Sequence, residues 1–259
     1  MPLPLSVFII AKDEADRIGR AIASVHEWAD EVIVIDSGST DGTQDIAAEL
    51  GATVIFNPWP GYGPQKRFGE DQCRNDWLLN IDADEEVTPE LRSEIEALFA
   101  DNQHLKADNW RIMIRDVFAH EDTPADWAYG YHQIRLYDRR KGRFSASTVH
   151  DTVRPQTGTR SADLQHPMAH RSIRSLEFQV GKYNRYSDMQ VADMQARGRK
   201  LPRSRLLSEF PLAFLKAYII RRYCRYGWWG LVLSVNYAHA RFLRVAKAYE
   251  AELLDKRRP

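Results

Sequence analysis

Residues 77–86 read Trp77-Leu78-Leu79-Asn80-Ile81-Asp82-Ala83-Asp84-Glu85-Glu86. The run that opens this stretch is apolar and predicts a buried β-strand, which the acidic residues follow directly. Acid clusters are usually solvated, but these are expected at the carboxyl end of a core strand, where open α/β sheets bind ligands. Residues two apart on an extended backbone point to the same side, so Asp82 and Asp84 can face one ligand. The stretch therefore points to a divalent cation and an anionic substrate.

The first hundred residues alternate short apolar runs with helical patterns. Strands are predicted over residues 5–10, 32–35, 53–56 and 77–81, with a helix between successive strands. Continuous apolar strands that alternate with helices indicate a mostly parallel, doubly wound sheet, hence an α/β fold. After residue 100 the pattern changes, and strands over 110–117 and 133–137 predict that the sheet becomes mixed.

The last third of the chain is predicted to be helical. The helical pattern starts near Leu176, with breaks expected at Pro202 and Pro211. We therefore expect a catalytic domain over residues 1–171 and a basic, aromatic helical region over residues 172–259. The alternative for this region is that its aromatic residues simply pack on the catalytic domain while its arginines are solvated.

Composition and charge set the broad class of the protein. Its 259 residues are 44% hydrophobic and 28% charged, as in an ordinary globular protein. Two cysteines without metal-ligand spacing, and an N-terminus without a basic leader, favour a reduced, cytoplasmic location. The net charge is zero, but residues 1–100 hold seven basic and 20 acidic residues, whereas the rest hold 29 and 16. This asymmetry suggests a metal site at one end and an anionic surface at the other.

Other predicted strands also end in polar residues. Asp36 ends the second strand, and Lys12 and Glu14 follow the first. The carboxyl ends of parallel strands meet at one edge, so these groups are expected in one crevice with Asp82 and Asp84. Each loop alone is weak evidence, because Asp36 in an Asp-Ser-Gly-Ser sequence is also a common turn former. Hard oxygen ligands of this kind suit Mg²⁺ or Mn²⁺.

Glu85 and Glu86, by contrast, are interpreted as solvated residues ahead of the helix that Thr88-Pro89-Glu90 opens.

A proline- and glycine-rich segment precedes a further basic pair. Residues 57–67 contain three prolines and two glycines and predict an irregular loop. Lys66 and Arg67, at the end of this segment, are expected near a helix start. Cations at this position can balance a diphosphate. A solvated surface pair is an equally good interpretation of the spacing.

Histidines and aromatic residues of the second half give further candidates. His150 and Asp151 form a loop pair from which a general base can come, although such pairs are more often structural. His170 can complete a metal site or bond a backbone carbonyl. The loop from residue 120 to 132 carries Trp127, Tyr131 and His132, which are candidates for binding the acceptor of a transferred group.

Taken together, these motifs resemble family 2 glycosyltransferases of the GT-A fold. The residues that carry the resemblance are 11–14, 36–43, 59–66 and 76–85, with Val149-His150-Asp151 and residues 183–187. Within that family the chain resembles bacterial lipopolysaccharide-core β-1,4-glucosyltransferases. One departure is Asp13, where many relatives carry Asn, and another is Asp151, where relatives more often carry Glu.

The resemblance implies a role for each matched residue. Lys12, Glu14, Asp36, Lys66 and Asp82 would bind a UDP-sugar, with Asp36 at the uracil or ribose, Lys66 near the diphosphate and Asp82 at the ribose. Asp84 would hold the Mg²⁺ or Mn²⁺, with His150 or His170 near it. Asp151 would be the base of an inverting single displacement that expels UDP.

The resemblance also implies the partners. The acceptor would be a lipid-linked saccharide such as the lipopolysaccharide core, with glucose as the expected sugar, at the inner face of the cytoplasmic membrane. The basic, aromatic tail favours peripheral attachment there. Nucleic-acid binding is not expected, because the basic stretch shows no recognition motif and the acidic N-terminal half would repel phosphates.

Two other functions fit parts of the pattern. A metal-dependent nucleotidyltransferase also uses acids on an α/β sheet, but usually has a glycine-rich phosphate loop near the first strand, which residues 9–13 do not form. A non-catalytic membrane-surface adaptor on a degenerate transferase fold would not need Asp36, Asp82 and Asp84 intact. UDP-sugar hydrolysis with added Mg²⁺ or Mn²⁺ separates the transferase from the adaptor.

Overall fold

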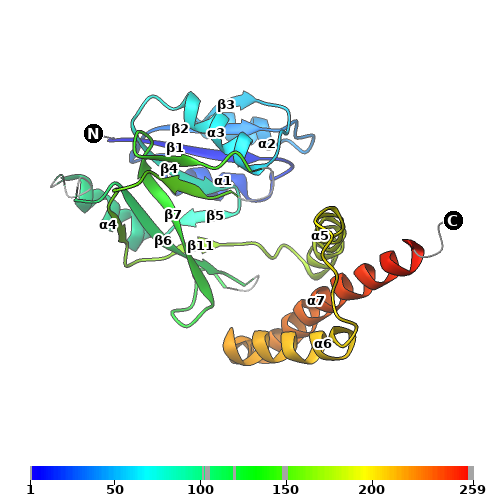
Figure 1. Ribbon diagram of the computed structural model, residues 1–259. Coiled ribbons are helices and arrows are strands. Elements are labelled where there is room, and N and C mark those ends of the chain that lie inside the picture. Colours follow the sequence, from blue (N-terminus) through cyan, green and yellow to red (C-terminus); the bar gives the residue numbers. More distant parts are fainter. Residues whose placement is uncertain (1, 101, 103–105, 119–120, 148–150, 256–259) are drawn as a thin grey trace. The chain divides into compact units, whose positions relative to one another are not determined.

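The chain divides into two compact units. The computed structural model describes residues 2–100, 102, 106–118, 121–147 and 151–255. One unit comprises Met1–Asp116 and Gly130–Ser172, and the other Val117–Tyr129 and Ile173–Pro259. Figure 1 shows the sheet of the first unit and the helices of the second. Among the described residues, no helix is long and apolar enough to cross a membrane.

A mixed nine-stranded sheet forms the first unit. Its main strand order is β3-β2-β1-β4-β7-β6-β11-β5, with β10 paired to β6. The first four strands in this order are parallel, whereas β7 runs antiparallel to both β4 and β6. The elements are β1 (Leu3–Ala11), α1 (Ile18–Ala23), β2 (Ala29–Asp36), α2 (Thr43–Glu49), β3 (Thr53–Phe56), α3 (Tyr62–Gln72), β4 (Trp77–Asp82), β5 (Glu85–Val87), α4 (Pro89–Ala100), β6 (Asn109–Asp116), β7 (Gly130–Asp138), β8 (Gly142–Phe144), β9 (Val153–Pro155), β10 (Ser161–Asp163) and β11 (Met168–His170). The predicted α/β class with a mixed sheet is confirmed.

Side chains that alternate along the strands build a core on each face of the sheet. On β1, Val7 and Ile9 belong to a large apolar cluster with residues of α1, α2 and α4. Phe8, between them, belongs to a second cluster with residues of α3 and of the β8–β9 hairpin. Because both faces are covered, the strands read as continuous apolar runs, which is why they are recognisable in the sequence.

Two local predictions are wrong. The irregular loop predicted over residues 57–67 ends early, because α3 begins at Tyr62 and includes Pro64. A proline in the first helical turn costs no hydrogen bond, since no carbonyl partner exists there. The helix was also expected to break at Pro211, but α6 (Arg205–Leu215) continues through it. The break expected near Pro202 is present as a non-helical stretch before α6.

Helices dominate the second unit. They are α5 (Leu176–Ala196), α6, the π-helical turn η2 (Lys216–Ile220), the 3₁₀ turn η3 (Tyr223–Tyr226) and α7 (Gly227–Asp255). The side chain of Ser175 caps α5 by accepting a hydrogen bond from the Phe178 amide, as serine does at helix starts. An aromatic core that includes Phe118, Tyr223 and Tyr226 holds the segment 117–129 within this unit.

Candidate functional site

The polar strand ends of the first unit lie side by side at one edge of the sheet. In the parallel ladders Ala11 is level with Asp36, and Ile10 is level with Asp82. The sheet thus brings the ends of β1, β2 and β4 together at its carboxyl edge, the usual ligand edge of such sheets.

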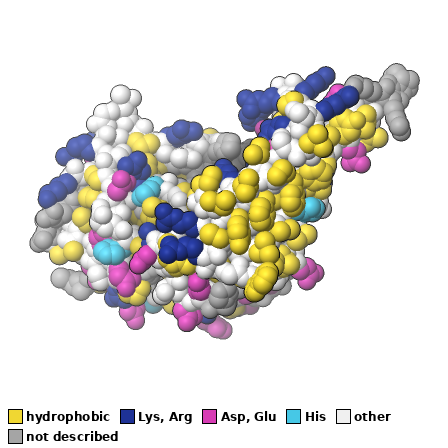
Figure 2. All heavy atoms as spheres, turned by 90° about the horizontal axis from the view of Figure 1, so that it is seen from below, with side chains coloured by type: hydrophobic (Ala, Val, Ile, Leu, Met, Phe, Trp, Pro, Cys, Tyr) yellow, Lys and Arg dark blue, Asp and Glu magenta, His cyan; other side chains and the backbone are white. Residues whose placement is uncertain are grey.

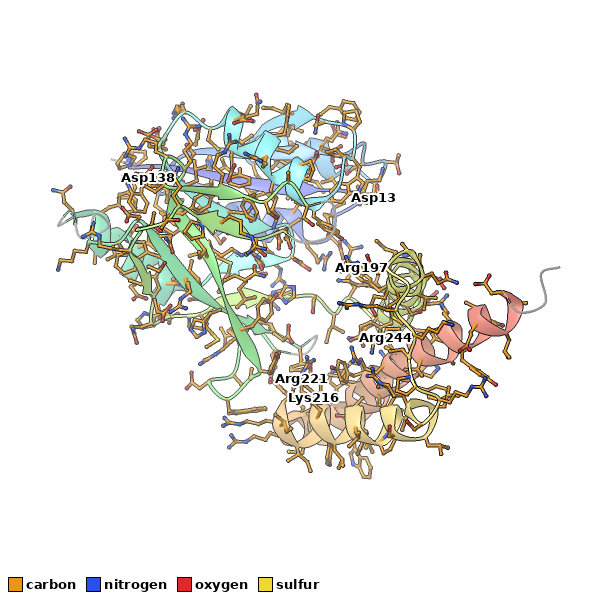
Figure 3. All side chains as sticks on the ribbon, in the orientation of Figure 1. Asp13, Asp138, Arg197, Lys216, Arg221 and Arg244 are labelled. Carbon is orange, nitrogen blue, oxygen red and sulfur yellow. The ribbon has the colours of Figure 1, made fainter. Side chains whose placement is uncertain are left out.

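Two loops at this edge bind each other through hydrogen bonds from backbone amides to side-chain oxygens. The Asp13 amide donates to Ser39 Oγ over 2.9 Å, and the Thr40 amide donates to Asp13 Oδ1 over 2.9 Å. Asp13, at the end of β1 (Figure 3), has a φ of 54°. Asp and Asn tolerate this left-handed region better than other side chains, so the Asp that departs from the family's Asn suits the backbone. Lys12 Nζ donates to the Gly38 carbonyl over 2.9 Å and remains exposed.

Asp36 organises the turn that follows β2. It is fully buried, and its Oδ1 accepts hydrogen bonds from the amides of Gly38 and Ser39 and from Gln44 Nε2. These contacts are the ones expected of an aspartate that stabilises a turn, the alternative to a ligand-binding role for Asp36. A direct contact between Asp36 and a nucleotide stays a prediction.

Lys66 joins two acids from distant parts of the chain. Its side chain is fully buried, and Nζ lies 2.8 Å from Asp82 Oδ1 and 2.7 Å from Asp151 Oδ2. A buried ammonium needs such partners, and the two carboxylates supply them. Burial alone would raise the pKa of Asp82, but Arg135 and Lys66 outweigh it and hold that pKa well below its usual range. Asp82 and Asp151 are therefore anchored at a common cation.

Arg135 is the second cation at Asp82. Its guanidinium donates to Asn80 Oδ1 over 2.7 Å, to Asp82 Oδ2 over 2.8 Å and to Glu85 Oε1 over 2.5 Å. In the β6–β7 ladder, Trp110 pairs with Leu136 and Arg111 with Ile134, which leaves Arg135 as an unpaired, bulged residue. A bulge re-aims a side chain, and here it directs the guanidinium of Arg135 to Asp82 of β4 and Glu85 of β5.

Glu85 is not a solvated residue ahead of a helix, so this prediction is wrong. It begins β5 and is fully buried, with its carboxylate on Arg135 and on the Asp82 amide, the latter at 2.9 Å. Glu86 lies in the same strand and pairs with Arg171 at 2.6 Å. The chain turns immediately after Asp82 and pairs β5 with β11, and the helix begins at Pro89, where it was predicted to open. Burial raises the pKa of Glu85 even though Arg135 opposes the shift.

Asp84 lies in the turn between β4 and β5 and has different partners from Asp82. Its Oδ2 is 3.4 Å from His170 Nε2 and 3.2 Å from Arg17 Nη1. Burial opposes ionisation, but His170 and Arg17 outweigh it and lower the pKa of Asp84 to about 2. Arg17 also pairs with Glu14, which ties the loop after β1 to this carboxylate. The turn, rather than an extended backbone, brings Asp84 to the site.

His170 lies between two carboxylates. Its Nδ1 is 3.0 Å from Asp116 Oδ1 on one side, and its Nε2 faces Asp84 on the other. Burial would lower the pKa of His170, but the hydrogen bonds to Asp116 and Asp84 raise it well above its usual value.

Two side chains of this arrangement, Asp84 and His170, could contribute ligands to a divalent cation. Among the described residues no three His, Cys, Asp or Glu side chains are grouped closely enough to hold a metal ion. Mg²⁺, however, typically takes only one or two protein ligands and fills its other positions with water and phosphate oxygens. Asp84 Oδ2 and His170 Nε2 can supply two donors, while Asp116 holds the imidazole through Nδ1, as carboxylates commonly do behind metal-bound histidines. His150, the other predicted metal-site histidine, lies outside the described residues.

The three predicted acceptor-binding residues are divided between the two units. Trp127 belongs to the second unit, where its ring packs on Tyr226 with centroids 4.4 Å apart. Tyr131 and His132 are neighbours on β7 of the first unit. Tyr131 pairs with Ile114 and so shares a face with Asp116, whereas His132 points to the opposite face. Burial, with the charge of Glu85, raises the pKa of the Tyr131 hydroxyl.

Four of the charged residues around Asp82, Asp84 and His170 were not predicted as site residues: Arg17, Glu85, Asp116 and Arg135. Arg135 had a usable signal, because an arginine flanked by Ile134 and Leu136 in a buried strand must find acidic partners. Asp116 carried none, since its contact with His170 depends on the parallel pairing of β6 with β11.

Comparisons with known proteins identify the family of the chain. Residues 6–166 match the family model described as glycosyl transferase family 2. An uncharacterized glycosyltransferase of Rickettsia felis is 43% identical over 97% of this chain and 92% of its own length. The lipopolysaccharide core biosynthesis glycosyltransferase LpsC of Rhizobium meliloti is 33% identical over 98% of this chain and 95% of its own. Among solved structures, residues 1–349 of S. aureus TarS align with a TM-score of 0.48 at 12% identity, over 98% of this chain and 92% of that one.

Proposed function

Because the chain belongs to glycosyl transferase family 2 and is a glycosyltransferase, we propose that it moves a sugar from a UDP-sugar to a hydroxyl of a lipid-linked saccharide. The acceptor class rests on the full-length similarity to a lipopolysaccharide core glycosyltransferase, and the lipopolysaccharide inner core is the proposed acceptor. Glucose is the proposed sugar, from the resemblance to core glucosyltransferases.

One observation carries the donor side of this proposal. Two acids leave the same strand end and are held by different cations, Asp82 by Lys66 and Arg135, and Asp84 by Arg17 and His170. In our proposal Asp82 accepts hydrogen bonds from the ribose of the donor. Lys66, which is buried and paired with Asp82, would contribute positive charge near the diphosphate. Lys12, Glu14 and Asp36 shape the neighbouring wall for the nucleotide.

The metal site of the proposal is Asp84 with His170. These two residues would hold Mg²⁺ or Mn²⁺, which supplies positive charge to the leaving diphosphate. Asp116 keeps the imidazole oriented, and Arg17 keeps the Asp84 carboxylate in place. His170 would have to release its Nε2 proton on loading, so ion binding is expected to weaken in acid.

Asp151 is the proposed general base. Asp151 Oδ2 lies 2.7 Å from Lys66 Nζ. This salt bridge orients the carboxylate before an acceptor binds. The acceptor hydroxyl would give its proton to Asp151 as its oxygen attacks the anomeric carbon and the bond to UDP breaks on the opposite face. Tyr131 is a proposed acceptor contact, because the charges of Glu85, Arg135 and Asp82 act on its hydroxyl.

The first experiment is UDP-sugar hydrolysis by the purified protein with Mg²⁺ or Mn²⁺. A panel of UDP-sugars identifies the donor, wild type is expected to release UDP, and Asp84→Ala is expected to lose this activity. The matched control is Glu90→Gln, an exposed acid six residues further along, which should behave as wild type. An inactive wild type with every UDP-sugar and both metals, or an Asp84→Ala variant as active as wild type, would contradict the proposal.

A further inference from the structure

Helix α6 of the second unit buries its acidic residue and exposes several of its leucines. Its one acidic residue, Glu209, is buried and faces the other helices, where it pairs with Arg205, Arg241 and Arg244. These arginines come from α6 itself and from α7. The charged groups of α6 thus pair inside the unit, and ion pairs help to hold α6 to α7.

The outward side of the same segment is apolar. Leu207 is 85% exposed, Ile220 72% and Trp228 84%. Leu212, Leu215 and Ile219 on the same segment are also largely exposed. Figure 2, which looks onto α6, shows hydrophobic side chains gathered in a broad area bordered by basic ones. We call the side chains of Leu207, Leu212, Leu215, Ile219, Ile220 and Trp228 the outer face. Contiguous exposed apolar surface of this kind marks a site of interaction.

Exposed cations occur in the same stretch of chain as the outer face. From residue 210 to residue 249 the sequence contains seven Lys and Arg and no Asp or Glu. Lys216, Arg222 and Arg225 are exposed, and they come from η2 and η3 or the residues beside them. Figure 3 labels Lys216 and Arg221 at the two ends of the turn that follows α6. An apolar strip with exposed cations beside it in the chain is complementary to a surface that is apolar inside and anionic outside.

We propose that the outer face inserts into the headgroup layer of an anionic membrane. The leucine and isoleucine side chains would enter the acyl boundary, Trp228 would lie at the interface, and Lys216 with the arginines would bind lipid phosphates. Long basic side chains can keep their charge in water while their stems cover apolar surface. This inference rests on the proposed function for the biological reason to bind a membrane, namely a lipid-linked acceptor, but the surface itself is independent of the catalytic site.

The test is co-sedimentation of the full chain with vesicles of phosphatidylethanolamine and phosphatidylglycerol. Wild type is expected to bind, and to bind more weakly to vesicles of phosphatidylcholine alone because the anionic headgroups are absent. In the triple variant Leu207→Gln, Leu212→Gln and Ile220→Gln, each side chain removed is expected to weaken partitioning about tenfold, so the variant should bind about 1000-fold more weakly. The control is Met189→Gln with Leu254→Gln, which changes exposed apolar residues of α5 and α7 outside the outer face and should bind as wild type.

The outcomes are separable. Circular dichroism melting should be unchanged in both variants, because the altered side chains are solvent-exposed. The proposal is overturned if wild type does not bind vesicles, if the triple variant binds as tightly as wild type, or if the control loses binding equally. It is also overturned if wild type ignores vesicles but forms a dimer that the triple variant dissociates, since a second copy would then cover the outer face. UDP-sugar hydrolysis without lipid, measured on the same samples, tests the proposed function separately.

Discussion

Arg135→Met should strongly destabilise the first unit. The substitution keeps an unbranched side chain but removes the guanidinium that binds Asn80, Asp82 and Glu85. Asp82 retains Lys66, whereas Glu85 is left buried without its cation and Asn80 Oδ1 loses its donor. Breaking a buried ion pair by removing one partner costs about 3–5 kcal/mol of unfolding free energy. For a chain of this size each kcal/mol lowers the Tm by about 2–4 °C, which predicts a fall of about 6–20 °C.

Differential scanning calorimetry is the suitable assay, because it can resolve the melting of two units. The double variant Arg135→Met with Glu85→Leu removes both charges together and should recover most of the lost stability, since apolar replacement of a buried pair is often close to neutral. The coupling energy from this double-mutant cycle separates the pair from general packing damage. A single variant that melts within about 2 °C of wild type, a shift that corresponds to at most about 1 kcal/mol, would refute the reasoning. So would a double variant as unstable as the sum of its two singles.

Three further predictions test other parts of the structure. Gly63→Ala should cost about 3 kcal/mol in thermal or urea unfolding, because its Cβ would lie 2.0 Å from a backbone carbonyl oxygen, whereas Gly19→Ala, whose nearest contact would be 3.5 Å, should be neutral or stabilising. Ellman's reagent should modify Cys224 alone in the native protein, since burial raises the pKa of the Cys73 thiol to about 12, and native titration of two thiols would contradict this. Asp151→Asn should lower transfer by about 100-fold or more but leave UDP binding intact, and full activity would exclude it as the base.

Local sequence pattern predicted β1 to β4, β6 and β7, but not the short strands β5, β8, β9, β10 and β11. Val7, Phe8 and Ile9 are all apolar because each faces a core on one side of the sheet or the other, so the run itself signals a buried strand. The polar residues after β1, β2 and β4 could be assigned to one edge for the same reason, because parallel strands end together.

Non-local pairing decided what the sequence could not show. Glu85 looks like a helix-start acid, since its burial depends on Arg135, 50 residues away, and on the bulge that aims that arginine. His170 meets Asp84 and Asp116 only because β11 pairs with both β5 and β6. In these cases the chemistry depends on strand order, which short-range periodicity does not encode.

The separate partners of the two acids at the end of β4 follow the same rule. The sequence spacing of Asp82 and Asp84 predicted that both face one ligand, whereas the turn after Asp82 gives each its own cations. Spacing alone therefore predicts that the two acids lie near each other but not which cations each one pairs with.

The most direct test of the central claim is calorimetric titration of UDP into the protein with and without Mn²⁺. Wild type is expected to bind UDP more tightly when Mn²⁺ is present. Asp84→Asn should lose the metal-dependent gain, because the substitution removes the carboxylate that would hold the ion beside His170. Failure of wild type to bind UDP in either condition, or an undiminished Mn²⁺ effect in Asp84→Asn, would contradict the account.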